Sequence, residues 1–112
     1  MVEETPRQKK NRTYREWQDA QDRLRRKHEE IEQMWEDFDA ARGALGWPNV
    51  PPNREADYDR LKAELWTKRA RLIQEADDLE EEAREKYEKY KEVRDAFWED
   101  LNRRLGLDQV KC

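Results

Sequence analysis

The chain has 112 residues, of which 46% are charged and 35% are hydrophobic, and its formal net charge is −4. This length suits one small domain, and this composition excludes a large closed core. The near balance of charges also excludes a uniformly basic field that would attract nucleic acid, or a strongly acidic one that would mimic it. The aromatic residues, which include five Trp and four Tyr, stand at helical spacing and argue against a disordered polyelectrolyte.

Cys112 is the only cysteine, which excludes an intrachain disulfide and a metal site built from several cysteines. No apolar run approaches the roughly 20 residues that cross a membrane. The first residues also lack the apolar segment of a signal peptide. We therefore expect a cytoplasmic protein with no membrane partner, or a component of a virus particle that is assembled in the cytoplasm.

Residues 6–42 are predicted to form the first helix, because Thr5 can cap it and Pro6 suits the first helical position. Apolar residues recur every seven positions and predict one seam of a coiled coil at Trp17, Leu24, Ile31, Phe38 and Leu45. We assign the adjoining seam position to Tyr14, Gln21, His28 and Trp35. His28 is interpreted as packed in this seam, because a metal site would need further ligands and the chain has no second histidine.

Residues 43–53 are predicted to form the turn of a hairpin. Gly43 or Gly46 can adopt the left-handed conformation that ends a helix, and three prolines disfavour helix continuation. We expect the apolar side chains of this segment to fold over the end of the hairpin: Leu45, Trp47 and Val50. A peptide-binding role for Trp47 with Pro48 is the alternative interpretation.

Residues 54–105 are predicted to form a second, longer helix without an internal Gly or Pro. Asn53 is expected to cap its start, and Gly106 to end it after Arg103 and Arg104. Its apolar residues recur at helical steps and share one face. They are Tyr58, Leu61, Leu65, Leu72, Ala76, Leu79, Ala83, Tyr87, Tyr90, Val93, Phe97, Leu101 and Leu105. A second stripe, about 100° around the helix, comprises Trp66, Ala70 and Ile73.

The order of charges favours an antiparallel arrangement. In each predicted helix a mainly basic part, residues 7–27 and 60–71, precedes a mainly acidic part, residues 29–39 and 75–85. Folding back at the turn lays basic on acidic at both ends, whereas parallel helices would lay basic on basic. The sequence therefore predicts an all-α fold: an antiparallel two-helix coiled-coil hairpin with a longer second helix. We expect one domain over residues 1–112 with a tail at 106–112, completed by oligomerisation or by a partner.

The sequence lacks the residue patterns that accompany common catalytic chemistry. It has no Gly-rich phosphate loop, no Cys/His metal spacing and no nucleophile elbow. Acidic runs such as residues 80–82 lack the interleaved histidine of helical di-metal sites. We predict no catalytic residue, no metal site and no cofactor, and hence a protein that is not an enzyme.

The lengths of the two helices predict where a partner docks. If residue 42 lies opposite residue 55, then Tyr14 lies near Ala83 and the first helix begins opposite about Lys91. Apolar residues past that point have no partner in the first helix and are predicted to bind protein: Val93, Phe97, Trp98, Leu101 and Leu105. The stripe of Trp66, Ala70 and Ile73 is the second predicted protein-binding surface, since two helices leave it in water.

These features predict a structural adaptor that docks through helical faces onto itself or onto a larger assembly, as a homo-oligomer or as a subunit. Settings that fit are a phage or viral structural component, an assembly scaffold or chaperone, and a brace in a larger complex. The alternative is a helical protein that binds nucleic acid, because Lys and Arg on one helix can contact phosphates. The residues assigned to this alternative are Arg7, Lys9, Lys10, Arg12, Arg15, Arg23, Arg25, Arg26 and Lys27.

Overall fold

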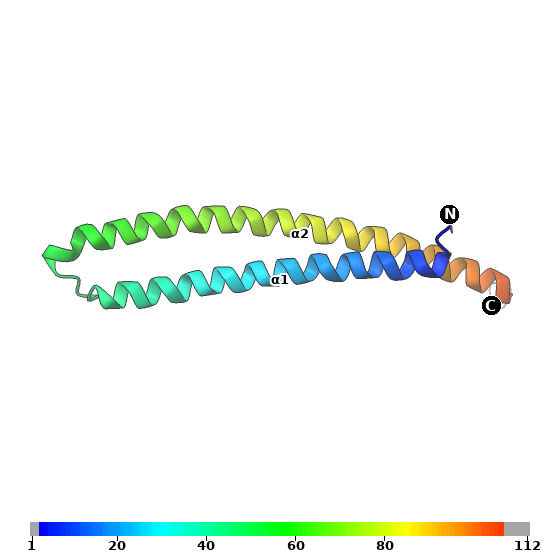
Figure 1. Cartoon of the computed structure of the whole chain (residues 1–112), viewed down its shortest axis with the longest axis horizontal. Helices are drawn as coiled ribbons and strands as arrows, with labels where there is room; N and C mark the ends of the chain where they lie inside the picture. The colour runs from blue at the N-terminus through cyan, green and yellow to red at the C-terminus, as the bar shows by residue number, and fades with distance from the viewer. Residues whose placement is uncertain (1–2, 107–112) are drawn as a thin grey trace, which may run out of the picture. The chain divides into compact units, whose positions relative to one another are not determined.

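The computed structural model describes residues 3–106 and places them in two α-helices and one short 3-10 helix (Figure 1). Helix α1 spans Pro6–Ala44, the 3-10 helix η1 spans Pro52–Arg54, and α2 spans Glu55–Leu105. The two helices pack against each other as an all-α hairpin, with no strand in the described residues. With 39 residues in α1 and 51 in α2, the predicted hairpin with a longer second helix is confirmed. The predicted tail beyond Gly106, with Cys112, lies outside the described residues.

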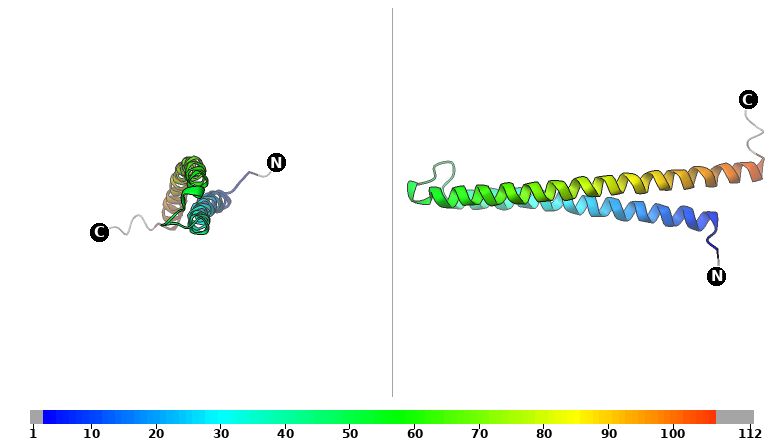
Figure 2. Two further views of the ribbon diagram at one scale, coloured as in Figure 1. Left: turned by 90° about the vertical axis from the view of Figure 1, so that its left-hand side faces the viewer. Right: turned by 90° about the horizontal axis from the view of Figure 1, so that it is seen from above.

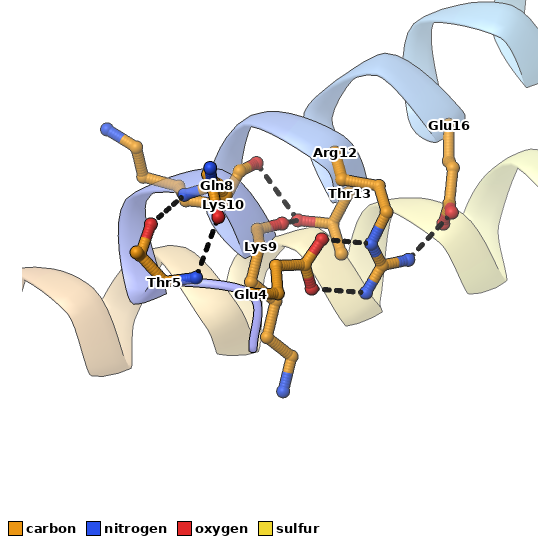
Figure 3. Close-up of polar contacts among 8 residues, drawn as sticks. All are labelled: Glu4, Thr5, Gln8, Lys9, Lys10, Arg12, Thr13 and Glu16. Atoms are coloured by element: carbon orange, nitrogen blue, oxygen red, sulfur yellow. Dashed lines mark hydrogen bonds and ion pairs between the residues drawn. The ribbon is translucent and has the colours of Figure 1, made fainter. Parts of the chain in front are cut away.

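The start of α1 is held by a reciprocal pair of hydrogen bonds between Thr5 and Gln8 (Figure 3). The Gln8 backbone N–H donates to Thr5 Oγ1 at 3.1 Å, and the Thr5 backbone N–H donates to Gln8 Oε1 at 2.9 Å. This capping box satisfies two N–H groups that have no partner within the helix. The predicted start at Pro6 with Thr5 as the cap is confirmed, and the Thr-x-x-Gln spacing is a signal that the sequence prediction did not use.

The left-handed residue of the turn is Gly46, with a φ of 98°. A Cβ atom at Gly46 would lie 3.2 Å from the Asn49 carbonyl oxygen, so both the conformation and the space favour glycine. Gly43, the other candidate, lies inside α1. The Trp47 N–H donates to the Arg42 carbonyl at 3.0 Å, and the Arg42 guanidinium lies 3.8 Å from the centroid of the Trp47 ring. Trp47 is thereby folded back on the last turns of α1.

The start of α2 differs from the prediction at Asn53. Asn53 lies within η1 and is not the N-cap of α2, so the predicted cap is wrong. The reason is that Pro52 has a fixed φ that suits the first position of a helical turn, and the chain already turns there. Arg54 Nη1 also donates to the Ala44 carbonyl at 3.0 Å across the turn. At the other end, Gly106 has a φ of 70° and ends α2 as predicted.

The described residues group into two compact units, each of which contains a segment of both helices. We call residues 23–79 the turn unit, and residues 3–22 with 80–106 the terminal unit. The core of the turn unit is Met34, Leu65 and Leu72, with Ile31 and Phe38 packed against it. Figure 1 shows the two helix segments of this unit (cyan and green) running side by side. A few aliphatic residues therefore form this core, as the low hydrophobic content requires.

The terminal unit buries small side chains. Ala20 and Ala83 are buried, and so is Thr13. Thr13 Oγ1 lies 2.9 Å from the Lys9 carbonyl oxygen and 3.0 Å from that of Lys10 (Figure 3). The hydroxyl group is thus hydrogen-bonded within its own helix, which removes most of the cost of burying it. These buried positions hold small side chains, in contrast to the aliphatic core of the turn unit.

The second seam position predicted for α1 is wrong. The residues predicted there are exposed: Tyr14, Gln21, His28 and Trp35. The adjoining position is buried or half-buried instead, at Thr13, Ala20, Lys27, Met34 and Ala41. The first seam position is confirmed as half-buried, at Trp17, Leu24, Ile31, Phe38 and Leu45. A seven-residue repeat allows either neighbouring position to face α2, and burial of Gln21 and His28 would have desolvated two polar side chains.

The prediction that the apolar stripe of α2 packs against α1 is confirmed by the burial of its members, except at the last residue. Its buried members are Leu65, Leu72, Ala76 and Ala83. Its half-buried members are Tyr58, Leu61, Leu79, Tyr87, Tyr90, Val93, Phe97 and Leu101. Leu105 is 63% exposed, because the last turn of α2 extends past the start of α1 (Figures 1 and 2).

The pairing of the helices is displaced from the prediction by about one heptad. In the terminal unit, the Tyr14 ring centroid lies 5.3 Å from that of Tyr90, whereas Tyr14 was expected near Ala83. In the turn unit, Ala41 lines one groove together with Leu61, whereas residue 42 was expected opposite residue 55. The reason is visible at the turn, where the first turn of α2 lies past the end of α1 before the two helices face each other (Figure 1).

Lys27 connects the two helices of the turn unit through carboxylates. Its Nζ lies 2.8 Å from Glu30 Oε2 on α1 and 2.7 Å from Glu75 Oε2 on α2. The hydrogen bonds to Glu30 and Glu75 raise the pKa of Lys27, and the hydrogen bond from Lys27 lowers the pKa of Glu30. A basic residue of α1 therefore meets an acidic residue of α2, as the antiparallel order of charges predicts.

Candidate protein-docking surfaces

The C-terminal surface, in the terminal unit, consists of Phe97, Trp98, Leu101 and Leu105 of α2. Lys10 of α1 lies over both aromatic rings, with Nζ 4.5 Å from the Phe97 centroid and 5.2 Å from the Trp98 centroid. The two rings meet edge to face with their centroids 5.3 Å apart. Ring faces attract cations, so Lys10 stabilises this arrangement. Trp98 nevertheless remains 49% exposed.

The start of α1 reaches further along α2 than predicted. Pro6 and Lys9 line a groove of 430 Å³ together with Val93, Phe97 and Asp100. The expectation that α1 begins opposite about residue 91 is therefore wrong, for the same reason as the displaced pairing of the helices. Val93 and Phe97 have neighbours in α1 and are not left unpartnered.

The five residues predicted to bind a partner at this end therefore differ in accessibility. Trp98 and Leu105 are exposed, Leu101 is half-buried, and Val93 and Phe97 are half-buried beside α1. Their role in partner binding stays a prediction. Trp98 and Leu105 are the members that a partner can reach without displacing α1.

Four aromatic rings form a cluster in the same unit. The Trp17 ring stacks on Tyr90, with centroids 5.6 Å apart and planes at 12°, and its centroid lies 4.9 Å from that of Tyr87. Tyr14 packs edge-on against Trp17 and Tyr90, at 5.9 and 5.3 Å, and is 44% exposed. Sequence reasoning placed these residues only on packing faces. The three-residue spacing within each pair, one pair on each helix, is the signal that could have indicated a cluster.

The side stripe, in the turn unit, consists of Trp66, Ala70 and Ile73 of α2. Trp66 is 57% exposed, Ala70 is exposed and Ile73 is half-buried. The Arg69 guanidinium lies 5.2 Å from the centroid of the Trp66 ring. The expectation that two helices leave this stripe accessible to solvent is confirmed for Trp66 and Ala70. Its role in partner binding stays a prediction.

Several of the basic residues of α1 are engaged by neighbouring side chains. Arg12 donates from Nε to Glu4 and from Nη1 to Glu16, each at 2.8 Å (Figure 3). The hydrogen bond from Arg12 lowers the pKa of Glu4, and the hydrogen bonds to Glu4 and Glu16 raise the pKa of Arg12. Lys10 lies over aromatic rings, and Lys27 is paired with carboxylates. These three cations are therefore less able to contact phosphate than the sequence suggests.

Two further structural findings concern metals and membranes. Within residues 3–106, no group of three or more His, Cys, Asp and Glu side chains is arranged to hold a metal ion. No helical stretch in the described part of the chain combines the length and the apolar character that crossing a membrane requires.

Comparison with known proteins gives no relative from which a function could be transferred. No protein-family model matches the chain, and neither a search of curated proteins nor a search of solved structures finds a significant match. The two surfaces are therefore interpreted from their own residues.

Proposed function

We propose that this chain is a non-enzymatic structural adaptor that docks through helical faces onto copies of itself or onto a larger assembly. The observation that supports this most is the exposure of tryptophan. Four of the five Trp residues are exposed: Trp35, Trp47, Trp66 and Trp98. Tryptophan is highly buried on average in folded proteins and is enriched among the residues that dominate protein interfaces. Trp47 is folded back on Arg42 of its own chain, and a partner that covers the other three explains why so polar a chain presents them.

Burial of the exposed apolar side chains would contribute favourably to the free energy of docking. Full burial of one large apolar side chain contributes about 1.5–3 kcal/mol. The C-terminal surface offers Trp98, Leu101 and Leu105, and the side stripe offers Trp66 and Ile73. Two or three such side chains contribute about 3–9 kcal/mol before the cost of association is subtracted. Association itself costs about 4–15 kcal/mol, so docking is expected to use several of these side chains together.

Coiled-coil packing is part of this proposal. The seven-residue repeat of α1 supplies the seam toward α2, and exposed aromatic residues such as Trp35 lie outside that seam. Additional helices that cover these positions would complete a bundle. A phage or viral structural component, an assembly scaffold or chaperone, and a brace in a larger complex are settings that use such an adaptor, in the cytoplasm or in a particle assembled there.

The proposal is tested by the mass of the full chain in solution. Sedimentation velocity from micromolar to submillimolar concentration, at low and high salt, should show oligomers that persist in high salt, because apolar docking is little screened. A Trp66→Ala/Trp98→Ala double variant should shift the mass toward the monomer. Trp47→Ala, which removes an exposed Trp at the turn, is the matched control. A chain that stays monomeric throughout would contradict docking onto itself.

Nucleic-acid binding by α1 is the second candidate function. Arg7, Lys9 and Arg15 are exposed in the terminal unit and favour it. Titration of the chain with duplex DNA should then show an affinity that falls steeply with salt, because phosphate contacts release counterions. The triple replacement of these residues by Ala should weaken binding, and an undetectable or salt-independent interaction would rule this function out.

A further inference from the structure

The first seam position of α1 continues backwards from Trp17 to Lys10. From Trp17 to Leu45, every seventh residue at this position is apolar and half-buried. Lys10 stands seven residues before Trp17 and is also half-buried, so a cation occupies the seam where each later repeat holds an apolar side chain. Its Nζ lies over the rings of Phe97 and Trp98, 4.5 and 5.2 Å from their centroids. An exposed cation–π contact contributes less than the burial of a large apolar side chain, so the seam ends in a weak contact.

The first two turns of α1, residues 6–12, have little apolar surface to hold them on α2. We call this segment the lid. Pro6 is its one apolar residue, and the other six are polar or charged. Pro6 and Lys9 line the groove of 430 Å³ together with Val93 and Phe97 of α2. The lid is therefore packed on α2 through one proline ring and the stems and head groups of lysines.

The charged groups of the lid do not fix it to α2. Arg12 is hydrogen-bonded to Glu4 and Glu16, which both lie on the same side of the hairpin as Arg12 itself. Within residues 3–106, no ion pair joins a cation of the lid to a carboxylate of α2. Local opening is easiest where few apolar contacts are buried. The lid therefore has the features of a segment that separates locally from its neighbour.

The lid covers part of the surface of α2 that the sequence predicts to bind a partner. Val93 and Phe97 are half-buried beside α1, whereas Trp98 and Leu105 are exposed. Val93, Phe97 and Leu101 follow one another at steps of four residues and share one face of the helix. Separation of the lid from α2 would therefore join the covered side chains to the exposed ones in one apolar surface.

We propose that the lid regulates the C-terminal surface: it lies on α2 in a closed state, which is the structure described above, and separates from α2 in an open state that gives a partner access to Val93 and Phe97. This inference rests on the proposed adaptor function, because it assigns a control to one of its docking surfaces. Lys10 sets the balance between the two states, since a strongly hydrated ammonium group can leave the rings for water.

Spin labels report the two states directly. In a Cys112→Ser background, labels at Arg7→Cys in the lid and Asp95→Cys on α2 occupy exposed positions. Pulsed electron–electron double resonance should show a main population at short distance and a minor population at longer distances. Labels at Asp19→Cys and Glu85→Cys, exposed positions of the same unit outside the lid, are the reference pair and should show one short distance.

Lys10→Glu and Lys10→Leu should shift the populations in opposite directions. K10E loses the attraction to the rings and places a negative charge against their negative faces. The long-distance population should rise about two- to fivefold, which is the effect of one exposed cation–π contact. K10L continues the apolar seam, so the long-distance population should fall. Arg15→Glu is the matched control, because it makes the same change of charge at an exposed position outside the lid.

Equal long-distance populations in K10E and K10L would overturn the lid, and so would a response to Arg15→Glu as large as the response to K10E. The reference pair guards against a general loss of packing. If its distance also lengthens in K10E, the substitution has separated the whole terminal unit, and the assignment of the opening to residues 6–12 is wrong.

Self-association of the chain without labels connects the lid to docking. In sedimentation equilibrium, K10E should strengthen association by the same factor as it raises the open population, because apparent affinity scales with the fraction of the competent state. K10L should weaken association. If the spin labels respond to Lys10 while association is the same in every variant, control of docking by the lid is wrong.

The same measurements separate this inference from the adaptor function. If Trp66→Ala/Trp98→Ala abolishes association while K10E and K10L leave it unchanged, the adaptor function holds and its regulation by the lid is wrong. If the unmodified chain and K10E are both monomeric at every concentration, docking onto itself fails together with its control by the lid.

Discussion

Single residues determine where the helices of this chain begin and end. Thr5 and Gln8 satisfy each other's backbone N–H groups at the start of α1, and Gly106 provides the left-handed residue that ends α2. Lys27 acts differently, because its ammonium group holds a carboxylate of its own helix and one of the opposite helix. These contacts contribute modest free energies, and each can be tested by one substitution.

Thr5→Ala should lower the free energy of unfolding by about 1 kcal/mol, within the range of 0.5–2 kcal/mol seen for lost N-caps. The reason is that the Gln8 backbone N–H loses the hydroxyl that accepts its hydrogen bond. Chemical denaturation followed by circular dichroism measures the change. Thr67→Ala is the matched control, because Thr67 Oγ1 donates only to the Ala63 carbonyl within α2. If Thr67→Ala lowers the free energy of unfolding as much as Thr5→Ala does, the capping explanation is wrong.

Lys27→Met should reduce the dependence of stability on pH. The folded-state pKa of Glu30 lies below its ordinary value of 4.5, so its pairing stabilises the fold above pH 4.5 and is lost as pH falls through the folded pKa. The folded-state pKa of Lys27 lies above its ordinary value of 10.5, so its pairing is fully present below pH 10.5 and is lost as pH rises through the folded pKa. In Lys27→Met, the free energy of unfolding should therefore fall less than in the unmodified chain, both at acidic pH and at strongly basic pH.

Urea unfolding across this pH range tests the expected effect of Lys27→Met. Arg60→Met is the control, because Arg60 is exposed and lies 3.8 Å from an exposed carboxylate of its own helix, Asp57. Parallel pH profiles for the unmodified chain and Lys27→Met would show that the pairing does not contribute to stability.

At the scale of the elements, the turn decides how the two helices pair. Gly46 reverses the chain, η1 continues the reversal, and the first turn of α2 lies past the end of α1. The pairing of residues along the helices is set by this geometry. A change in the turn should therefore affect stability more than the few residues involved would suggest.

Gly46→Ala and Gly43→Ala should change stability in opposite directions. Gly46 has a φ of 98°, and an added Cβ would lie 3.2 Å from the Asn49 carbonyl oxygen, so Ala should destabilise the fold by about 1–2 kcal/mol. Gly43 lies in α1 with no atom within 4 Å of an added Cβ, so Ala should stabilise it by about 0.4–1 kcal/mol. Thermal melts of the two variants, side by side, measure the contrast. Destabilisation by both changes would mean that Gly43 does not remain helical.

At the scale of the whole molecule, few apolar residues are buried among residues 3–106. The buried hydrophobic residues are Ala20, Met34, Leu65, Leu72, Ala76 and Ala83. Ordering the chain costs about 1.5 kcal/mol per residue, and two helices can bury only one face of each other. We therefore expect the isolated hairpin to be marginally stable and association to supply the remainder.

The melting temperature should accordingly rise with protein concentration, because association stabilises the folded chain by mass action. The Trp66→Ala/Trp98→Ala variant should lose most of this dependence. Differential scanning calorimetry over a wide concentration range measures both. A compact monomer that melts cooperatively at the same temperature at every concentration would contradict this expectation.

The sequence by itself determined the elements and their order. Thr5-Pro6, Gly46 with the prolines of the turn, and Gly106 are local signals, and they act through backbone conformations that do not depend on the rest of the fold. The apolar stripe of α2 could also be predicted from the sequence, because helical spacing places its members on one face. Trp66 and Trp98 were found in the same way, as large side chains that two helices leave accessible.

Only the tertiary structure decided which second seam position of α1 faces α2, how far the helices are displaced along each other, and that Lys10 covers Phe97 and Trp98. A seven-residue repeat is satisfied by either neighbouring position and by a shift of one whole heptad, so local spacing cannot choose among these arrangements. The choice depends on contacts between residues far apart in the chain. Burial of Thr13 and Ala20 in place of Tyr14 and Gln21, and the path of the turn, select the observed one.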